Sequence, residues 1–176
     1  MAEFKDALSY VLIEEGGYVP AELDPNGGET YRGISRNNFP NWDGWHDIDA
    51  LQPIERGEIL DSIIVASKVN TFYKANCWNR LLGDMITEQS VATYLYDWFV
   101  NSGGNAIKEL QKALGLTVDG GFGKDCLAAV NGFEGDLLQV IHNARIAYYE
   151  RIGTGKNAVF INGWLNRANG LYDKLK

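Results

Sequence analysis

The chain has 176 residues, of which 45% are apolar and 22% charged. A chain of this length buries roughly 70% of its unfolded surface, which argues against a disordered protein and against a fold that depends on disulfides. The formal net charge of −7 argues against a protein that grips nucleic acid through its phosphates. No run approaches the ~18 apolar residues of a membrane span, so we expect no integral membrane segment.

The sequence shows no pattern for a metal or an organic cofactor. Cys77 and Cys126 lie far apart and form no zinc motif, and the sequence leaves open whether they pair. His46 and His142 share no metal-ligand spacing. We therefore expect no metal and no cofactor. The N-terminus lacks the basic and apolar regions of a signal peptide, so we expect the protein to be cytoplasmic as made.

Helical periodicity dominates the chain. An apolar stripe over residues 4–12 predicts a first helix, which should end at Gly16-Gly17 because glycine favours the left-handed conformation after a helix. From Tyr18 to Trp45, proline and glycine interrupt the pattern. The pair Asn26-Gly27 is a turn signal and predicts a small β-hairpin.

The remaining sequence predicts further helices and a mainly α fold class with one irregular or β excursion after the first helix. The expected helices cover residues 53–78, 87–101, 106–114, 124–130, 136–152 and 163–175, with Thr87 and Asn105 as N-caps. The helix over 53–78 has Ile54, Ile59, Ile63, Ile64, Val69 and Phe72 as its apolar positions. No linker separates domains, and the best candidate boundary lies near residues 83–90.

Glu15 is the candidate proton donor. It falls at the end of the first helix, where the helix dipole and the neighbouring Glu14 both disfavour an ionised carboxylate. Both effects raise the pKa of a carboxyl group, as a general acid at neutral pH requires. Asp24 and Thr30 follow on either side of the predicted turn, where a hairpin would place them beside Glu15. On these residues alone, a solvated helix end is the alternative.

Aromatic and polar residues near these positions are candidates for substrate binding. Aromatic rings stack on the apolar faces of a ligand, and polar side chains bind its hydroxyl groups. Tyr18 lies three residues after Glu15, and Tyr31 follows Thr30 directly. Both tyrosines are therefore expected to line the cleft beside Glu15.

A second group of candidates lies on the helix predicted over residues 87–101. Tyr94, Asp97 and Asn101 share one face of that helix, for which plain solvent exposure is the alternative. Tryptophans are further candidates for stacking on sugars, with core packing as the alternative for each of them: Trp42, Trp45 and Trp78.

The spacing of Glu15, Asp24 and Thr30 resembles that of the glutamate, aspartate and threonine of phage-type lysozymes. The wider string over residues 15–34 resembles glycoside hydrolase family 108, a muramidase family that includes phage endolysins and secretion activator proteins. Three later blocks resemble the same family in order: residues 97–103, 110–123 and 160–167. The chain departs from the family pattern at residues 20–22, where many members carry Asn-Asp-Pro, and at Asn26, which looks like an extra residue.

The resemblance implies a lysozyme-like fold with a catalytic region over residues 1–86 and a peptidoglycan-binding-like region over residues 87–176, packed into one compact unit. It implies cleavage of the β-1,4 bond between N-acetylmuramic acid and N-acetylglucosamine in peptidoglycan. Glu15 would protonate the leaving oxygen, Asp24 would supply the second carboxylate and Thr30 would orient a water. Retention and inversion stay open, since the separation of the two carboxyl groups distinguishes them.

The resemblance also implies where the residues of the later blocks and the protein itself act. It places Asp97 and Asn101 at the glycan cleft, while Leu110, Ala113 and Leu114 are expected in the core. The expected partner is the glycan strand of peptidoglycan, reached in the periplasm by a monomer after release through a holin or a secretion system. A phage role and a host role both stay open. The alternatives are a lytic transglycosylase and a non-catalytic wall-binding or secretion-assisting protein.

Overall fold

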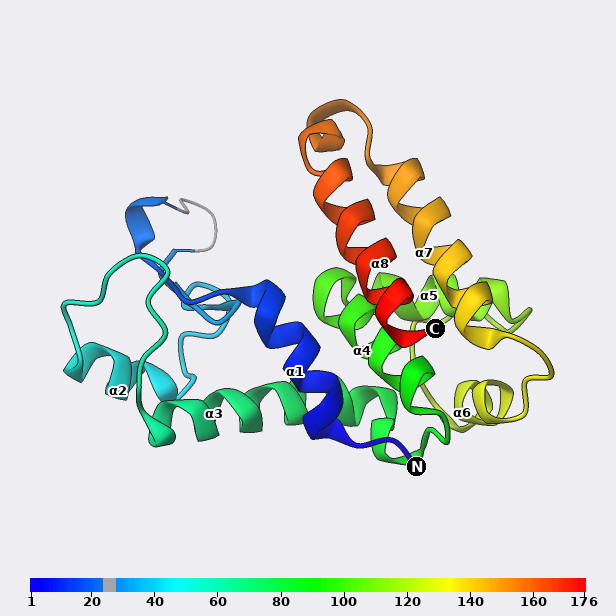
Figure 1. The fold of residues 1–176 in the computed structure, drawn as a ribbon, viewed down its shortest axis with the longest axis horizontal. Helices are drawn as coiled ribbons and strands as arrows, with labels where there is room; N and C mark the ends of the chain where they lie inside the picture. The colour runs from blue at the N-terminus through cyan, green and yellow to red at the C-terminus, as the bar shows by residue number, and fades with distance from the viewer. Residues whose placement is uncertain (24–27) are drawn as a thin grey trace. The chain divides into compact units, whose positions relative to one another are not determined.

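The computed structural model describes residues 1–23 and 28–176, and it is mainly α-helical (Figure 1). Its α-helices are α1 (Phe4–Glu15), α2 (Gly44–Ala50), α3 (Ile63–Tyr73), α4 (Gln89–Ser102), α5 (Gly104–Ala113), α6 (Lys124–Asn131), α7 (Leu137–Ile152) and α8 (Ile161–Leu175). Short helical turns are η1 (Ala21–Leu23), η2 (Lys74–Trp78), η3 (Asn79–Leu81), η4 (Gly83–Met85) and η5 (Gly155–Val159). The strands are β1 (Tyr18–Val19), β2 (Thr30–Tyr31) and β3 (Ile34–Ser35). The predicted fold class is confirmed.

The described residues form two compact units. The smaller unit comprises Val11–Lys74 and holds the three strands, α2 and α3. The larger unit comprises Met1–Tyr10 and Ala75–Lys176 and holds α4 to α8. The predicted division into a catalytic region over residues 1–86 and a peptidoglycan-binding-like region over residues 87–176 stays a prediction. Within the part of the chain that the structure describes, no helix has the length and apolar character needed to cross a membrane.

The sheet of the smaller unit is antiparallel, in the order β1-β2-β3. Tyr31 pairs with Tyr18 on one side and with Ile34 on the other. Arg32 and Gly33 join β2 to β3 with φ angles of 50° and 77°, the pattern of a tight two-residue hairpin turn. The turn predicted at residues 26–27 lies outside the described residues, but β1 and β2 on either side of it pair as a hairpin requires.

The helix expected over residues 53–78 begins ten residues later than predicted, at Ile63. Ser62 ends the upstream segment because its extended backbone and its side chain cap the helix, with Oγ accepting from Val65 N–H at 3.3 Å. Three of the isoleucines given as its apolar positions, Ile59, Ile63 and Ile64, are 56%, 88% and 62% exposed. The predicted start of this helix was wrong.

The segment before α3 pairs with β1 instead of forming a helix. Tyr18 N–H donates to Glu58 O at 2.9 Å, and Gly57 N–H donates to Tyr18 O at 2.7 Å. Gly57 has a φ of 82°, which a helix interior does not accommodate. Helix α2 precedes this segment and was not predicted, because only seven residues form it.

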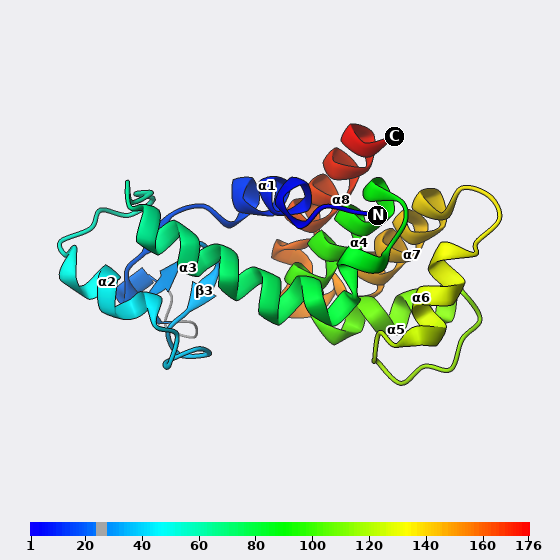
Figure 2. The same ribbon diagram turned by 90° about the horizontal axis from the view of Figure 1, so that it is seen from below.

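In the larger unit, α7 and α8 lie side by side and both pack on α4 (Figures 1 and 2). Helix α4 forms the centre of this unit, since every residue from Val91 to Phe99 is buried. Trp78 is fully buried beside it, with its ring 5.5 Å from that of Tyr96 and 5.8 Å from that of Phe4. The alternative of core packing therefore holds for Trp78.

The helix ends show which capping predictions were correct. Helix α7 begins one residue after the predicted start at Asp136, which caps the helix instead, its carboxylate accepting from Gln139 N–H at 2.9 Å. Thr87 was wrongly expected to cap α4. Its N–H and hydroxyl instead donate to Asn131 Oδ1 at 3.0 and 3.3 Å, and α4 begins two residues later. Asn105 lies inside α5 rather than before it.

Candidate active site

Two glycines position Glu15 at the end of α1. Gly16 follows it with a φ of 64°, so the helix ends in the left-handed conformation that glycine adopts without strain. Gly17 packs so closely against the Gly57 and Glu58 carbonyls that a side-chain carbon would collide with them. The Glu-Gly-Gly motif therefore turns the chain sharply from α1 into β1.

Gly33 of the β2–β3 turn lies close to the Glu15 carboxyl group. A side-chain carbon built on Gly33 would lie 2.5 Å from Glu15 Oε2 and 2.7 Å from the Tyr73 hydroxyl. Both oxygens therefore lie against the same backbone atom. Tyr73 is buried and donates its hydroxyl proton to Arg32 O at 2.6 Å, whereas Glu15 is partly exposed. The carboxyl group is thus neither sealed in the core nor splayed into solvent.

Arg32 brings a positive charge to the end of α1. Its Nη1 donates to Leu12 O at 2.9 Å and to Gly16 O at 3.2 Å, and its backbone N–H donates to Gly17 O at 3.2 Å. These bonds satisfy carbonyls that a helix end leaves open, and the guanidinium offsets the negative end of the dipole. Reasoning from the sequence missed this residue, because its partners lie up to twenty positions away.

Thr30 lies in β2, partly exposed, between its partners Val19 and Ser35 in neighbouring strands. Its hydroxyl donates to Gly28 O at 3.3 Å. Asp24 lies outside the described residues, so its distance from Glu15 and the choice between retention and inversion stay predictions.

Tyr18 and Tyr31 are both buried in the smaller unit. The Tyr18 hydroxyl donates to Glu29 Oε1 at 2.8 Å, and burial together with this hydrogen bond raises the pKa of Tyr18. The Tyr31 hydroxyl accepts from Leu60 N–H at 3.1 Å. Both residues therefore brace the sheet, and their contact with a sugar stays a prediction.

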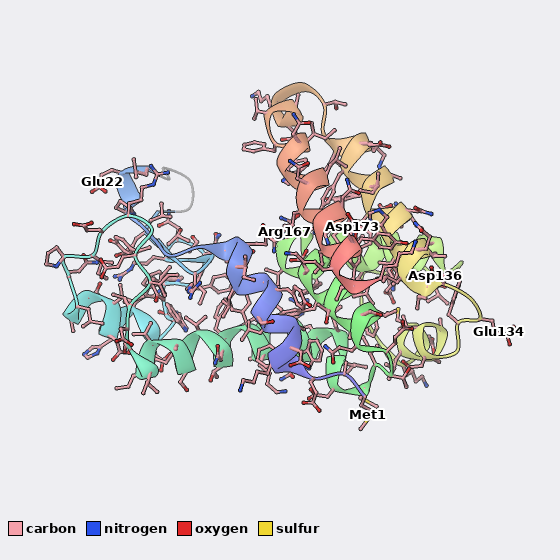
Figure 3. All side chains as sticks on the ribbon, viewed as in Figure 1. Met1, Glu22, Glu134, Asp136, Arg167 and Asp173 are labelled. Carbon is pink, nitrogen blue, oxygen red and sulfur yellow. The ribbon has the colours of Figure 1, made fainter. Side chains whose placement is uncertain are left out.

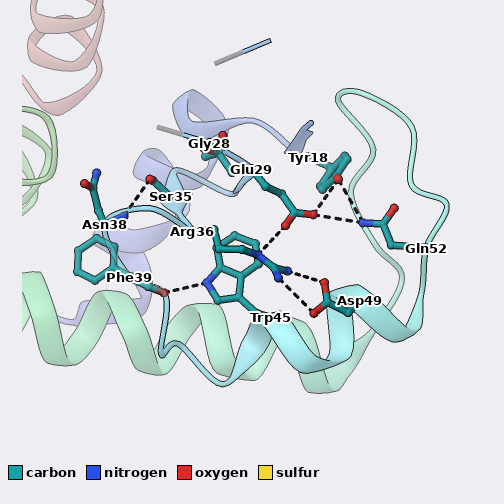
Figure 4. A network of polar contacts seen from close by, with 11 residues as sticks. Tyr18, Gly28, Glu29, Ser35, Arg36, Asn38, Phe39, Trp45, Asp49 and Gln52 are labelled. Carbon is teal, nitrogen blue, oxygen red and sulfur yellow. Dashed lines mark hydrogen bonds and ion pairs between the residues drawn. The ribbon is translucent and has the colours of Figure 1, made fainter. Parts of the chain in front are cut away.

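Glu29 anchors a polar network beside Thr30 (Figure 4). Besides Tyr18, its carboxylate accepts from Gln52 Nε2 at 3.3 Å and forms an ion pair with Arg36 Nε at 2.6 Å. Arg36 also donates to the Asp49 carboxylate at 2.5 and 3.2 Å, and this contact raises the pKa of Arg36. The Glu29 carboxylate therefore holds β2 in place, and it was not among the residues predicted from the sequence.

The tryptophans of the smaller unit serve packing. Trp45 is buried, donates from its indole to Phe39 O at 2.9 Å and carries the Arg36 guanidinium 4.4 Å above its ring (Figure 4). Trp42 is partly exposed and meets Trp45 edge to face, with ring centres 5.1 Å apart.

In the larger unit, two of the three α4 candidates are buried. Tyr94 is 0% exposed, its hydroxyl lies 2.8 Å from His142 Nδ1, and burial raises the pKa of Tyr94. Asp97 is 1% exposed and is bound by Arg145 at 2.7 Å and by Arg167 at 2.8 Å. These placements give Tyr94 and Asp97 structural roles, which explains the polar face of α4 without a ligand.

Asn101 is the exposed member of the α4 group. Its Oδ1 accepts from the Tyr149 hydroxyl at 2.6 Å, so its amide has a fixed orientation. Arg167, which pairs with Asp97, projects from α8 (Figure 3). Arg145 and Arg167 were not predicted as partners of Asp97, since each lies at least 48 positions from it.

Within residues 1–23 and 28–176, no group of three or more histidine, cysteine, aspartate or glutamate side chains is arranged to hold a metal ion. Cys77 and Cys126 do not form a disulfide with one another.

Comparisons with known proteins agree with the resemblance seen in the sequence. A family model described as glycosyl hydrolase 108 matches residues 8–103, and one described as a predicted peptidoglycan domain matches residues 105–169. The solved structure of SagA from Brucella abortus is 30% identical, with a TM-score of 0.73, over 98% of this chain and 92% of that chain. No curated protein matches. Together the two family matches support a glycosidase related to peptidoglycan, and the chain belongs to the glycosyl hydrolase 108 family.

Proposed function

We propose that the protein is an N-acetylmuramidase that hydrolyses the β-1,4 bond between N-acetylmuramic acid and N-acetylglucosamine, with Glu15 as the general acid. The observation that carries this proposal is the placement of Glu15. It is a partly exposed carboxyl group against the glycine backbone of the β2–β3 turn, within the segment that the glycosyl hydrolase model matches.

In the proposed reaction, the Glu15 carboxyl group gives its proton to the leaving glycosidic oxygen. The sugar then passes through a transition state like an oxocarbenium ion, which needs a negative group or a positioned water on its far side. Asp24 supplies that negative group, and the Thr30 hydroxyl orients the water. Tyr73 and Arg32 act as positioning residues, because they fix the turn against which the Glu15 carboxyl group lies.

Clearing of a cell-wall suspension tests the role of Glu15. The variant Glu15→Gln keeps the shape of the side chain but loses its acidic proton, so we expect activity to fall by about 10²–10⁴-fold. Glu3→Gln is the matched control, since Glu3 is an exposed glutamate before the other end of the same helix, and it should clear the wall like the wild type. Equal activity of Glu15→Gln and wild type would reject the assignment.

The same digest separates the alternatives. A lytic transglycosylase closes the sugar on itself without adding water, so its products are lighter than hydrolysis products by the mass of a water molecule. A wall-binding protein without activity would sediment with peptidoglycan and release no reducing ends. Asp24 and Thr30 favour hydrolysis, because both are suited to directing a water nucleophile.

We also propose that this monomeric enzyme reaches its substrate after leaving the cytoplasm, through a holin or a secretion system. Peptidoglycan lies outside the cytoplasmic membrane, so an enzyme made in the cytoplasm has to cross that membrane to reach it. Expression of the protein alone should leave bacteria intact, while coexpression with a holin should lyse them. Lysis by the protein alone would argue against this route.

A further inference from the structure

The larger unit contains a cavity of about 390 Å³ in the segment that joins α5 to α6. This volume is typical of ligand pockets, which span roughly 300–1,000 Å³. Gln111 of α5, Thr117 and Asp119 of the connecting loop, and Lys124 and Asp125 of α6 all contribute to its lining. None of these residues takes part in the glycosidase chemistry proposed above.

Gln111 holds the loop wall of the cavity rigid. Its buried amide accepts hydrogen bonds at Oε1 from the N–H groups of Asp119 and Gly120, at 3.1 and 2.9 Å. Its Nε2 donates to Asp119 Oδ1 at 2.7 Å and to Gly121 O at 3.0 Å. A preformed wall of this kind lowers the ordering cost of binding a ligand.

Asp119 presents one carboxylate oxygen for a ligand. Its Oδ1 accepts from Gly121 N–H at 2.8 Å and from Gln111, and these hydrogen bonds lower the pKa of Asp119. Its Oδ2 has no hydrogen-bond partner among the residues that the structure describes. Asp125 adds a second exposed carboxylate to the lining. This side of the cavity therefore favours a cationic group.

The start of α6 presents the complement for an anionic group. Its first helical hydrogen bond runs from Leu127 N–H to Gly123 O at 3.0 Å, so the N–H groups of residues 124–126 lie ahead of the helical bonds. Gly123 at the N-cap has no side chain to satisfy them, and Lys124 adds a positive charge in the same turn as the Asp125 carboxylate. A carboxylate fits at these N–H groups and Lys124.

We propose that this cavity binds the free amino-acid end of a peptidoglycan stem peptide, at a carbon that carries both an ammonium and a carboxylate group. The ammonium lies against Asp119 Oδ2 and Asp125, and the carboxylate lies at the start of α6. The diaminopimelic acid of a stem that is not cross-linked presents such an end. This inference rests on the proposed function in taking peptidoglycan as the substrate, and the cavity lies inside the predicted peptidoglycan domain.

Titration of the full-length protein with a stem tripeptide that ends in diaminopimelic acid tests the inference by NMR. The peptide carries no sugar, so the glycosidase site is not engaged. We expect saturable shifts of the backbone amides of residues 119–125. Acetylation of the free amine, or its replacement by a lysine end without the neighbouring carboxylate, should weaken binding by about tenfold or more, as the loss of a charge-assisted contact does.

Two variants test whether the cavity carboxylates bind the ammonium group, and a third variant is the matched control. Asp119→Asn keeps an oxygen to accept from Gln111 and Gly121 but loses the negative charge, so we expect about tenfold weaker binding at an unchanged melting temperature. Asp125→Asn is the second variant, because its side chain makes no hydrogen bond within the described residues. Glu134→Gln removes an exposed carboxylate from the α6–α7 connection (Figure 3) and should bind like the wild type.

Several outcomes would overturn the inference. They are the absence of shifts at residues 119–125, equal affinity for the acetylated peptide, equal affinity of both cavity variants and the wild type, and equivalent shifts from a disaccharide without a peptide. The glycosidase proposal fails separately, through Glu15→Gln in the wall-clearing assay, because the tripeptide contains no glycosidic bond.

Discussion

Single residues define the candidate site, and the most informative of them has no side chain. Gly33 combines a φ of 77° with a position at which an added side-chain carbon would collide with both the Glu15 carboxyl group and the Tyr73 hydroxyl. Neither contact follows from the sequence, since Tyr73 lies forty positions from Gly33. The sequence predicted Glu15 from its place before two glycines, but it could not identify Arg32 or Tyr73, which reach the site only through the fold.

Gly33→Ala tests this close approach. The added carbon would lie 2.5 Å from Glu15 Oε2, and the left-handed backbone would also be strained. We expect wall-clearing activity to fall by about tenfold or more, since small misplacements of a catalytic group cost that much or more. Gly163→Ala is the control, because no atom lies within 4 Å of its added carbon. Wild-type activity in Gly33→Ala would show that the approach is unimportant.

A second prediction at the residue scale concerns Asp97, to which the structure gives a structural role in the larger unit. Asp97→Asn would leave the fully buried Arg145 without its carboxylate, and breaking such a buried pair costs about 3–5 kcal/mol. Urea denaturation measures this loss. Asp49→Asn, at the exposed ion pair with Arg36, should cost no more than about 1 kcal/mol. Similar losses in both variants would contradict the structural role of Asp97.

At the scale of elements, the sequence predicted those helix ends that are fixed by neighbouring residues. The end of α1 at two glycines follows from neighbouring residues and was predicted correctly, and the start of α7 was predicted to within one residue. The start of α3 was predicted wrongly, because the prediction followed isoleucines at helical spacing and did not consider Ser62 as the N-cap. The pairing of the preceding segment with β1 depends on distant residues, which periodicity does not show.

The contact between α4 and α7 includes a histidine, His142, whose protonation should make the stability of the protein depend on pH. Burial and the nearby Arg145 charge lower the pKa of His142 below its ordinary value of 6.5, although Asp173 opposes them. The unfolded chain therefore binds a proton at a higher pH than the folded chain does. This histidine contributes stability above pH 6.5, and the contribution is lost as the pH falls from there through its folded pKa.

Melting temperatures of the wild type and His142→Phe across this range measure the effect. We expect the wild type to lose more stability than His142→Phe between about pH 7 and pH 5, because phenylalanine stacks on Tyr172 without titrating. Tyr94→Phe controls for the loss of the hydroxyl contact, since it keeps the titrating ring. Parallel pH curves for wild type and His142→Phe would contradict this account.

At the scale of the whole molecule, net charge affects how binding to the cell wall depends on salt. With a net charge of −7, it gains no long-range attraction to an anionic wall, so binding must come from short-range contacts. We expect cosedimentation of the Glu15→Gln variant with peptidoglycan not to fall steeply between low and high salt, because salt also screens the repulsion between two negatively charged partners. A steep loss of binding with salt would indicate a basic wall-binding surface instead.

The most direct test of the whole account is digestion of purified peptidoglycan in heavy-oxygen water, followed by mass spectrometry. For the wild type, the account predicts muropeptides with a heavy oxygen at a new N-acetylmuramic acid reducing end. Glu15→Gln should give about 10²–10⁴-fold less of these products, while Glu3→Gln should give them in wild-type amounts. Labelled products in wild-type amounts from Glu15→Gln, or unlabelled anhydro ends from the wild type, would contradict the claim that Glu15 drives hydrolysis.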